Sequence, residues 1–322
     1  MYRKLLDVLA DPVTREPLRL LDDNGADWIE EGTLVGSGDR RYPIVRGIPR
    51  FVEGGYARSF GLQWNRFDRV QLDSASGDRS STDRFVQEVG WGPELMGQWV
   101  VDAGCGAGRF AEVAASYGAE VAAVDISDAV EAAARNLGHL PNVHVVQADI
   151  AALPFRPEMI RNVFSVGVLQ HTPDPPGVAR SIVEFLGAKA RFSFTIYGRR
   201  PWTRLNAKYL VRPLTRRLPP KTLLGAIEKV MPVMFPVTTV LFRLPLVGRV
   251  MRFCIPIANY TGYPGAQTAW LYQQAVLDTY DMLAPRFDRP MTPKELSGAI
   301  GHLCETLEVR SAIPLVVHGV RA

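Results

Sequence analysis

The chain has 322 residues, of which 47% are hydrophobic and 22% charged, a composition typical of a globular protein with a substantial core. Its three cysteines, Cys105, Cys254 and Cys304, form no CxxC pair, which indicates a reducing, metal-free interior. No signal-peptide pattern opens the sequence, and no stretch of about 18 uncharged apolar residues follows, so we expect a cytoplasmic protein without a spanning helix.

The net charge of +4 is distributed unevenly. Twelve Lys and Arg residues but one acid, Glu228, lie between Tyr197 and Cys254, which gives this segment a charge of +11 and leaves −7 for the remainder. A basic segment in an otherwise acidic protein indicates a local partner or surface.

Residues 1–55 are expected to form a small, separate β-rich unit. The segments Leu5–Leu18 and Arg41–Phe51 resemble the zinc-ribbon-like module found on activators of tRNA methyltransferases and fused to many bacterial methyltransferases. In that module a Cys-Pro-x-Cys knuckle holds zinc, whereas this sequence has Asp11-Pro-Val-Thr14 and no cysteine before Cys105. The resemblance implies a module without its metal, held by packing alone, which is either a structural relic or a partner-binding unit.

A linker and entry helix are expected over residues 56–98. The segment Ser59–Phe67 resembles the SFGxxW entry segment of bacterial methyltransferases. Two roles are open for Phe60 and Trp64: they close over a cofactor, or they dock the linker on the core.

Strands and helices alternate over residues 99–196. Strands are expected at 99–104, 119–125, 143–148, 161–169 and 189–196, and helices at 107–118, 127–137 and 175–187. A capped helix from Thr292 and strands at 307–313 and 315–320 follow, so residues 286–322 complete a seven-stranded sheet. This alternation predicts an α/β, Rossmann-like, doubly wound fold.

The most informative segment, Trp99–Phe110, is a strand that runs into a glycine turn. Gly104, Gly106 and Gly108 allow positive φ angles and let a ligand approach the bare backbone. A dinucleotide fingerprint requires a third glycine at the position of Arg109, so nicotinamide and flavin dinucleotides are disfavoured.

Acidic residues end three of the predicted strands. Asp125 can accept hydrogen bonds from a ribose diol, and Asp149 can accept one from an adenine amino group between Ile126 and Ile150. Asp102, at the mouth of the glycine turn, suits a ligand with an ammonium group and no phosphate. A nucleoside with a cationic amino-acid tail meets all of these requirements.

At these motifs the chain resembles the class I, type 11 methyltransferases that depend on S-adenosylmethionine (SAM). The residues that carry the resemblance are Val101–Phe110, Val124–Ser127, Gln147–Ile150, Leu153–Phe155 and Val168–Asp174. In the last segment Gln170 replaces one histidine of the family's VLHHTPDP pattern. The resemblance covers residues 56–196, and it implies an antiparallel last strand. It also implies SAM contacts at Asp102, Ala103, Gly104, Cys105, Gly106, Gly108, Asp125, Ile126, Asp149, Ile150 and Gly167.

Residues 197–285 are expected to form a basic and apolar helical insertion. The stretch Val230–Phe242 is apolar, broken by Pro232 and Pro236, and too short to cross a bilayer. It is either part of a lid over the acceptor, the favoured interpretation, or an element that lies in a membrane interface with arginines on lipid phosphates.

A further helix, Gln267–Leu283, and the segment Asn259–Tyr263 offer pocket-lining candidates whose alternative role is packing. These are Trp270, Tyr272, Tyr280, Asp281, Tyr260 and Tyr263.

Methyl transfer requires an acceptor atom held within about 3–3.5 Å of the methyl group. An oxygen or carbon acceptor must also lose a proton, and histidine is the usual base near neutral pH. His171, just past the fourth strand, is the predicted base, with a structural role in the SAM pocket as the alternative. Asp278 and Asp281 are weaker candidates.

The favoured function is therefore O- or C-methylation of a small-molecule acceptor of the glycan, lipid-linked or secondary-metabolite type. An RNA methyltransferase is an alternative, but the Asn-Pro-Pro-Tyr-type motif of base methylation is missing after the fourth strand, so nucleic acid is disfavoured. A non-catalytic SAM-binding or membrane-docked scaffold is the other alternative. Peripheral contact with the inner membrane face through residues 197–254 stays open.

Overall fold

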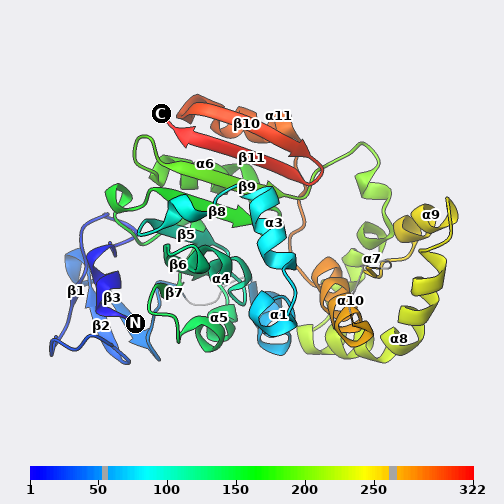
Figure 1. Ribbon diagram of the computed structural model, residues 1–322, viewed down its shortest axis with the longest axis horizontal. Helices are drawn as coiled ribbons and strands as arrows, with labels where there is room; N and C mark the ends of the chain where they lie inside the picture. Colours follow the sequence, from blue (N-terminus) through cyan, green and yellow to red (C-terminus); the bar gives the residue numbers. More distant parts are fainter. Residues whose placement is uncertain (53–56, 261–266) are drawn as a thin grey trace.

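A computed structural model describes residues 1–52, 57–260 and 267–322. Its centre is a seven-stranded sheet in the order β10-β11-β9-β8-β5-β6-β7 (Figure 1). The strands are β5 (Trp99–Ala103), β6 (Glu120–Asp125), β7 (Val143–Gln147), β8 (Asn162–Val166), β9 (Arg191–Ile196), β10 (Cys304–Ala312) and β11 (Leu315–Arg321). The first five are parallel, and β11 is antiparallel to both of its neighbours. The predicted Rossmann-like fold is confirmed.

Helices cover both faces of this sheet because its strands are apolar along their length, and successive side chains point to opposite faces. Val100 and Val121 pack toward the helices α3 (Ser80–Glu88), α4 (Arg109–Ser116) and α5 (Ala129–Leu137). Their neighbours Val101 and Ala122 face the opposite layer, which contains α6 (Pro175–Phe185) and α11 (Pro293–Ile300). At the start of α11, Thr292 and Glu295 form a capping box.

The N-terminal residues form a small antiparallel sheet beside the main one (Figure 1). Its strands are β1 (Arg19–Leu20), β2 (Gly32–Val35), β3 (Arg41–Val45) and β4 (Ile48–Pro49). The backbone amide of Phe51 donates to the carbonyl of Gln147, so the chain after β4 pairs with the edge strand β7. Leu9 forms a β-bridge with Phe155, and the apolar side chains of both sheets belong to one hydrophobic cluster.

A helical layer lies beyond the carboxyl ends of the parallel strands. It contains α1 (Arg58–Arg66), the short α2 (Asp73–Ser76), α7 (Ala207–Thr215), α8 (Pro220–Leu241), α9 (Val247–Cys254) and α10 (Thr268–Leu283). In Figure 1, α7–α10 form the right-hand part of the molecule. The helices α8 and α10 pack together through a cluster that includes Leu223, Ile227 and Met231 from α8.

The predicted break at Pro232 and Pro236 was wrong, because α8 is continuous over 22 residues. A proline inside a helix leaves the carbonyl four residues earlier without its partner. Both prolines lie on the exposed side of α8, where water can solvate those carbonyls, while Met231 and Thr238 anchor the inner side.

Candidate functional site

A cavity of about 670 Å³ lies at the carboxyl ends of β5, β6, β7 and β8, under α1, α3 and α10. It has a part along the strand ends and a part under the helices. Most of the predicted site residues line it, namely Gly104, Cys105, Gly106, Asp125, Ile126, Asp149, Ile150, Gly167 and His171. Asp102, Ala103 and Gly108 are buried, but they do not form part of its lining.

The glycine turn presents bare backbone to the cavity. Gly104 has φ +96°, and a Cβ atom there would lie 2.4 Å from Val168 Cγ1. A Cβ on Gly106 would lie 2.9 Å from the Trp64 indole, which packs over the turn. Phe60 and Trp64 both line the cavity, which favours the interpretation that they close over a cofactor.

Asp125 is held at the end of β6 by three hydrogen bonds. Its Oδ1 accepts from the amide and hydroxyl of Ser127 at 2.8 and 2.7 Å, and its Oδ2 accepts from the amide of Gly106 at 3.1 Å. Burial raises the pKa of Asp125, and these hydrogen bonds oppose the rise. An ionised carboxylate offers about four acceptor positions, so one remains for a ligand hydroxyl.

Two further carboxylates have spare acceptor capacity. Asp149 Oδ1 accepts from the amide of Ala151 at 2.9 Å, and its side chain lines the cavity. Asp102 Oδ2 is buried and has no partner within the described part of the chain. Burial and the nearby charge of Asp125 raise the pKa of Asp102 well above its usual value. A ligand ammonium close to this turn would offset that unfavourable charge.

His171 lines the cavity from the short helical turn Leu169–His171, just after β8. Its Nδ1 is 3.0 Å from the carbonyl oxygen of Phe287, and since a carbonyl can only accept, Nδ1 carries the hydrogen. The rings of Phe60 and Tyr197 flank the imidazole at centroid distances of 5.2 and 5.5 Å. Nε2 is buried and lacks a partner among the described residues, so its lone pair is available to a ligand.

The part of the cavity under the helices is lined by charged and aromatic side chains. The sequence analysis named four of them, Tyr260, Trp270, Asp278 and Asp281, but missed two arginines. Arg84 pairs with Glu88 at 2.8 Å, and Arg109 donates to the hydroxyl of Ser81 at 2.8 Å. Burial lowers the pKa of Arg109 to about 10. Arg84, on α3, belongs to no motif in the sequence. Arg109 begins α4 directly after the glycine turn, but the motif alone does not identify it as a ligand group.

Hydrogen-bonded acids complete this part of the cavity. The Tyr260 hydroxyl donates to Asp278, and burial raises the pKa of Asp278 to about 6. Asp281 accepts from Tyr197 and from the Gln63 amide, each at 3.2 Å. These contacts lie beside His171, as Tyr197 touches its ring.

The other predicted candidates divide between the cavity and the core. Trp270 lines the cavity, whereas Tyr280 is fully buried and Tyr272 packs edge-on against Phe235. Tyr263 lies outside the described residues. None of the described residues of α7, α8 or α9 lines the cavity, so after Tyr197 the predicted insertion contributes to its wall through Ala258, Tyr260 and α10.

The residues present fit SAM. Bare backbone at the glycine turn, the spare acceptor positions of Asp125 and Asp149, and the unpartnered Asp102 oxygen match an adenosine with an ammonium-bearing tail. Within residues 1–52, 57–260 and 267–322, no group of three or more His, Cys, Asp or Glu side chains is arranged to hold a metal ion.

Residues 101–194 match the family profile described as "Methyltransferase domain". A ubiquinone biosynthesis O-methyltransferase from Pseudomonas fluorescens Pf-5 is 31% identical over 129 residues, which are 38% of this chain and 56% of the relative. The enzyme of the same name from Pseudomonas putida F1 is 30% identical over 154 residues, covering 43% of this chain and 66% of the relative. The chain thus spans a little over half of the first relative's length.

Among solved structures, a SAM-dependent methyltransferase from Mesorhizobium loti is 28% identical, with a TM-score of 0.30. The match covers 33% of this chain and 49% of that one. The profile match and the named relatives identify residues 101–194 as a SAM-dependent methyltransferase domain, and SAM as its cofactor.

Proposed function

We propose that this chain transfers the methyl group of SAM to an oxygen or carbon atom of a small molecule. The observation that carries this proposal is a single cavity lined by Asp125 and Asp149 at one end and by His171 beside a polar second part. The Pseudomonas relatives, named as O-methyltransferases, favour oxygen as the acceptor atom. The proposed acceptor belongs to the glycan, lipid-linked or secondary-metabolite type.

Three carboxylates are proposed to contact SAM or to offset its charge. Asp125 accepts from a ribose hydroxyl, and Asp149 accepts from the adenine amino group between Ile126 and Ile150. Asp102 offsets the charge of the SAM ammonium through the glycine turn. When bound, SAM supplies an electrophilic methyl group on a sulfonium leaving group.

The neighbouring residues of the turn complete the proposed SAM site. The backbone of Gly104, Cys105 and Gly106, which line the cavity, gives SAM its close approach, and Gly167 borders the methyl group. Ala103 and Gly108 do not line the cavity, and their proposed role is to hold the turn in shape. Burial raises the pKa of the Cys105 thiol well above its usual value, so this residue packs and does not act as a nucleophile. Arg84 and Arg109 offer positive charge to the SAM carboxylate or to an anionic acceptor.

His171 is the proposed general base. Its Nε2 lone pair removes the proton from the acceptor hydroxyl as the new bond to carbon forms. The walls formed by Phe60, Trp64 and α10 exclude water and align the acceptor, which supplies much of the rate. A phenolic hydroxyl has a pKa of about 10, within reach of a neutral imidazole, whereas an aliphatic alcohol is far less acidic. We therefore favour a phenol or catechol as the reacting group.

Turnover with small acceptors tests this function. The purified chain is incubated with SAM and a panel of phenols, catechols and hydroxyquinones, and formation of S-adenosylhomocysteine is measured. We expect turnover that depends on the acceptor. SAM binding without turnover of any compound would overturn the acceptor class, and an absence of SAM binding would overturn the function itself.

The N-terminal sheet is proposed to be a zinc-ribbon-like module in which hydrogen bonds replace the metal. Asp11 and Thr14 stand where the knuckle would carry its two cysteines. Asp11 is fully buried, accepts from the amides of Val13 and Thr14 at 2.8 and 3.1 Å, and pairs with Arg40 at 2.8 Å. Burial opposes ionisation, but these bonds outweigh it and lower the pKa of Asp11. The Asp11–Arg40 pair thus joins the two loops that a metal would join.

The helices α7–α9 are proposed to contact an anionic membrane surface from the cytoplasmic side. Thirteen of the twenty large hydrophobic side chains that are most exposed in the described chain lie between Trp202 and Val250. Four of them, Val230, Val233, Val237 and Val240, recur at helical spacing and form one stripe along α8. An exposed apolar stripe of this length is characteristic of an interaction surface.

Exposed basic side chains lie in the same part of the chain, residues 204–252. Those exposed are Arg204, Arg216, Arg217, Lys221, Lys229, Arg243, Arg249 and Arg252. The acid of this region, Glu228, pairs with Arg66 at 3.2 Å. Lipid phosphates complement this charge, whereas a second copy of the same surface would bring like charges together.

The length of α8 also permits a second arrangement, in which this helix crosses the bilayer. Within the described residues, α8 is the one helix that is long and apolar enough to cross a bilayer, by length and composition only, with a mean hydropathy of 1.4 and 28% of that stretch buried. Its inner face packs along α10 through Leu223, Ile227 and Met231. This packing favours a helix that lies in the interface with its outer valines toward lipid.

A further inference from the structure

We propose that α7 acts as a clamp that holds His171 in the tautomer required of a base. The inference rests on the proposed role of His171 in methyl transfer. Arg212, together with Lys208 and Tyr209, fixes the segment after α10 so that the carbonyl of Phe287 meets Nδ1–H of the histidine. These side chains are positioning residues, because none of the three lines the cavity.

The tautomer of His171 depends on one backbone carbonyl. The Phe287 carbonyl accepts from Nδ1 at 3.0 Å, so the lone pair is left on Nε2. A neutral histidine in water exchanges its hydrogen between the two nitrogens, and the bond made by one nitrogen decides the state of the other. If Phe287 moved, Nε2 could carry the hydrogen and could no longer take one from an acceptor.

The segment that carries Phe287 lies between α10 and α11 without helix or strand of its own. Its core side is tied by the amide of Arg289, which donates to the carbonyl of Gln170 at 2.8 Å. Gln170 directly precedes His171, so this bond sets the spacing between the histidine and the segment. The outer side is held by side chains from α7.

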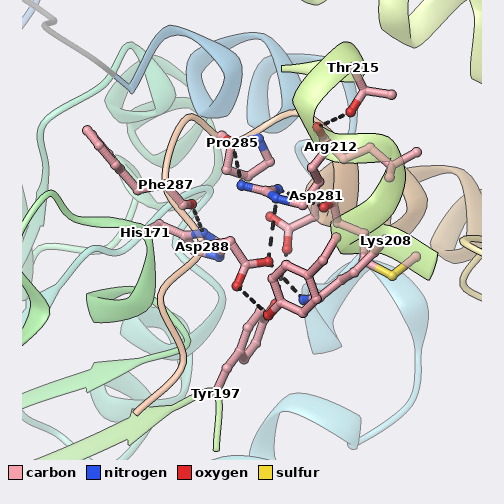
Figure 2. Close-up of polar contacts among 12 residues, drawn as sticks. His171, Tyr197, Lys208, Arg212, Thr215, Asp281, Pro285, Phe287 and Asp288 are labelled. Atoms are coloured by element: carbon pink, nitrogen blue, oxygen red, sulfur yellow. Dashed lines mark hydrogen bonds and ion pairs between the residues drawn. The ribbon is translucent and has the colours of Figure 1, made fainter. Parts of the chain in front are cut away.

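Figure 2 shows the contacts made by α7. Arg212 donates through Nη1 to the carbonyl of Met282 and through Nη2 to the carbonyl of Pro285, each at 2.8 Å. The Arg212 side chain is buried, with 7% of its surface exposed. A guanidinium donates to two carbonyls from two nitrogens held in a fixed plane. A lysine would have to make both hydrogen bonds from a single, freely rotating ammonium group. Thr215 adds a bond to the carbonyl of Leu283 at 2.9 Å.

Asp288 fastens the other end of the segment. Its fully buried carboxylate accepts from Lys208 Nζ at 2.8 Å and from the Tyr209 hydroxyl at 3.1 Å. Burial opposes ionisation, but Lys208 and the neighbouring cations outweigh it and lower the pKa of Asp288. Phe287 is therefore held on one side by Arg212 at Pro285 and on the other by Asp288 (Figure 2). The side chains that fix this segment thus all come from α7.

Nuclear magnetic resonance of nitrogen-labelled histidine tests the clamp without any turnover. The chain has five histidines, and the spectrum of His171→Gln assigns the His171 signal. In the wild type, we expect Nδ1 to carry the hydrogen. In Arg212→Met, the signal should shift toward a mixture of tautomers, and Arg212→Lys should restore it partly. Thr215→Val is a milder change and should shift the His171 signal less. It provides the same measurement if Arg212→Met does not fold.

Kinetics with SAM and catechol supply the second readout. Arg212→Met should lower kcat by about 10- to 100-fold while the KM for SAM changes little. The pH profile should also change, because Asp288, Lys208, Tyr197 and Asp281 all face His171 or its ring neighbour. Arg180→Met is the control, since Arg180 also donates to a backbone carbonyl, that of Ala299, away from the cavity.

The possible outcomes separate this inference from the proposed function. An unchanged His171 tautomer in folded Arg212→Met and Thr215→Val would overturn the clamp, whatever the kinetics. A shifted tautomer with unchanged kcat would retain the clamp and overturn the role of His171 as base.

Discussion

The carboxylate of Asp125 accepts a hydrogen bond from the backbone amide of Gly106, at 3.1 Å, and so ties the end of β6 to the glycine turn after β5. One group therefore shapes the turn and faces the cavity. Asp125→Asn keeps the size of the side chain but removes a charged acceptor, whose hydrogen bonds contribute about 1.5–3 kcal/mol each.

We expect Asp125→Asn to weaken SAM binding by about 10- to 100-fold in isothermal calorimetry. Glu158→Gln, on the exposed surface, is the matched control and should bind as the wild type does. Equal SAM affinity in Asp125→Asn and the control would contradict the assignment of Asp125 to the ribose.

Replacement of His171 separates chemistry from binding. His171→Gln should lower kcat with catechol by about 10²- to 10⁴-fold, the range of a general base. SAM affinity should stay within a few-fold of the wild type, because the proposed partner of Nε2 is the acceptor and not SAM. A large loss of SAM affinity with kcat retained would instead assign His171 to the shape of the cofactor pocket.

The raised pKa of Asp278 leads us to expect that the stability of the fold depends on pH. Since its pKa is raised to about 6, the folded chain keeps a proton that the unfolded chain loses near pH 4. The stability that it contributes is present below about pH 4 and is lost as the pH rises through about 6. Relative to Asp278→Asn, the free energy of unfolding of the wild type should fall by about 2 to 3 kcal/mol between pH 4 and pH 7. Urea titrations at each pH measure it, and parallel curves would refute the prediction.

The valine stripe of α8 predicts binding to anionic vesicles. The wild type should float with phosphatidylglycerol vesicles, bind phosphatidylcholine vesicles weakly, and be released by 1 M salt, at which the Debye length is about 3 Å. Val233→Asp with Val237→Asp should abolish flotation, since both side chains are exposed, by 66% and 42%. Val309→Asp on β10, where the side chain is 41% exposed and so comparable to Val237, is the control. Flotation that is equal in all three proteins, or missing in the wild type, would reject the membrane contact.

The N-terminal sheet predicts independence from zinc. Chelator should leave the melting temperature unchanged, and elemental analysis should find far less than one zinc per chain. Asp11→Ala should lower the free energy of unfolding by about 1 to 3 kcal/mol, because it strands buried donors that Asp11 now satisfies. Asp27→Ala, an exposed change in the same unit, should have little effect. Stoichiometric zinc would contradict the proposed replacement of the metal.

The sheet and the cofactor end of the cavity follow from local patterns in the sequence. Short apolar runs with acidic ends, such as Val121–Asp125, identify a strand and its ligand-facing terminus together. The family resemblance supplied the antiparallel direction of β11. Gln63 and Arg84 carry no such pattern, since they reach the cavity only through the packing of α1 and α3. Arg109 directly follows the glycine turn, but that motif does not identify its side chain as part of the cavity.

The course of α8 illustrates a different difficulty. Pro232 and Pro236 predict a break by local chemistry, but packing on α10 and exposure of both prolines override it. His171 was predicted as a candidate base from its position after β8, whereas its tautomer depends on Phe287, 116 residues later. Contacts of that sequence separation have no local signature.

The pairing of Phe51 with Gln147 has a consequence for the two sheets as units. This hydrogen bond pairs the edge of β7, and Leu9 forms a β-bridge with Phe155 in the same hydrophobic cluster. Removal of the first fifty or so residues would leave the edge of β7 unpaired. It would also expose to solvent the apolar side chains that now pack against the N-terminal sheet. The N-terminal sheet is accordingly an integral part of this fold and not a separable domain.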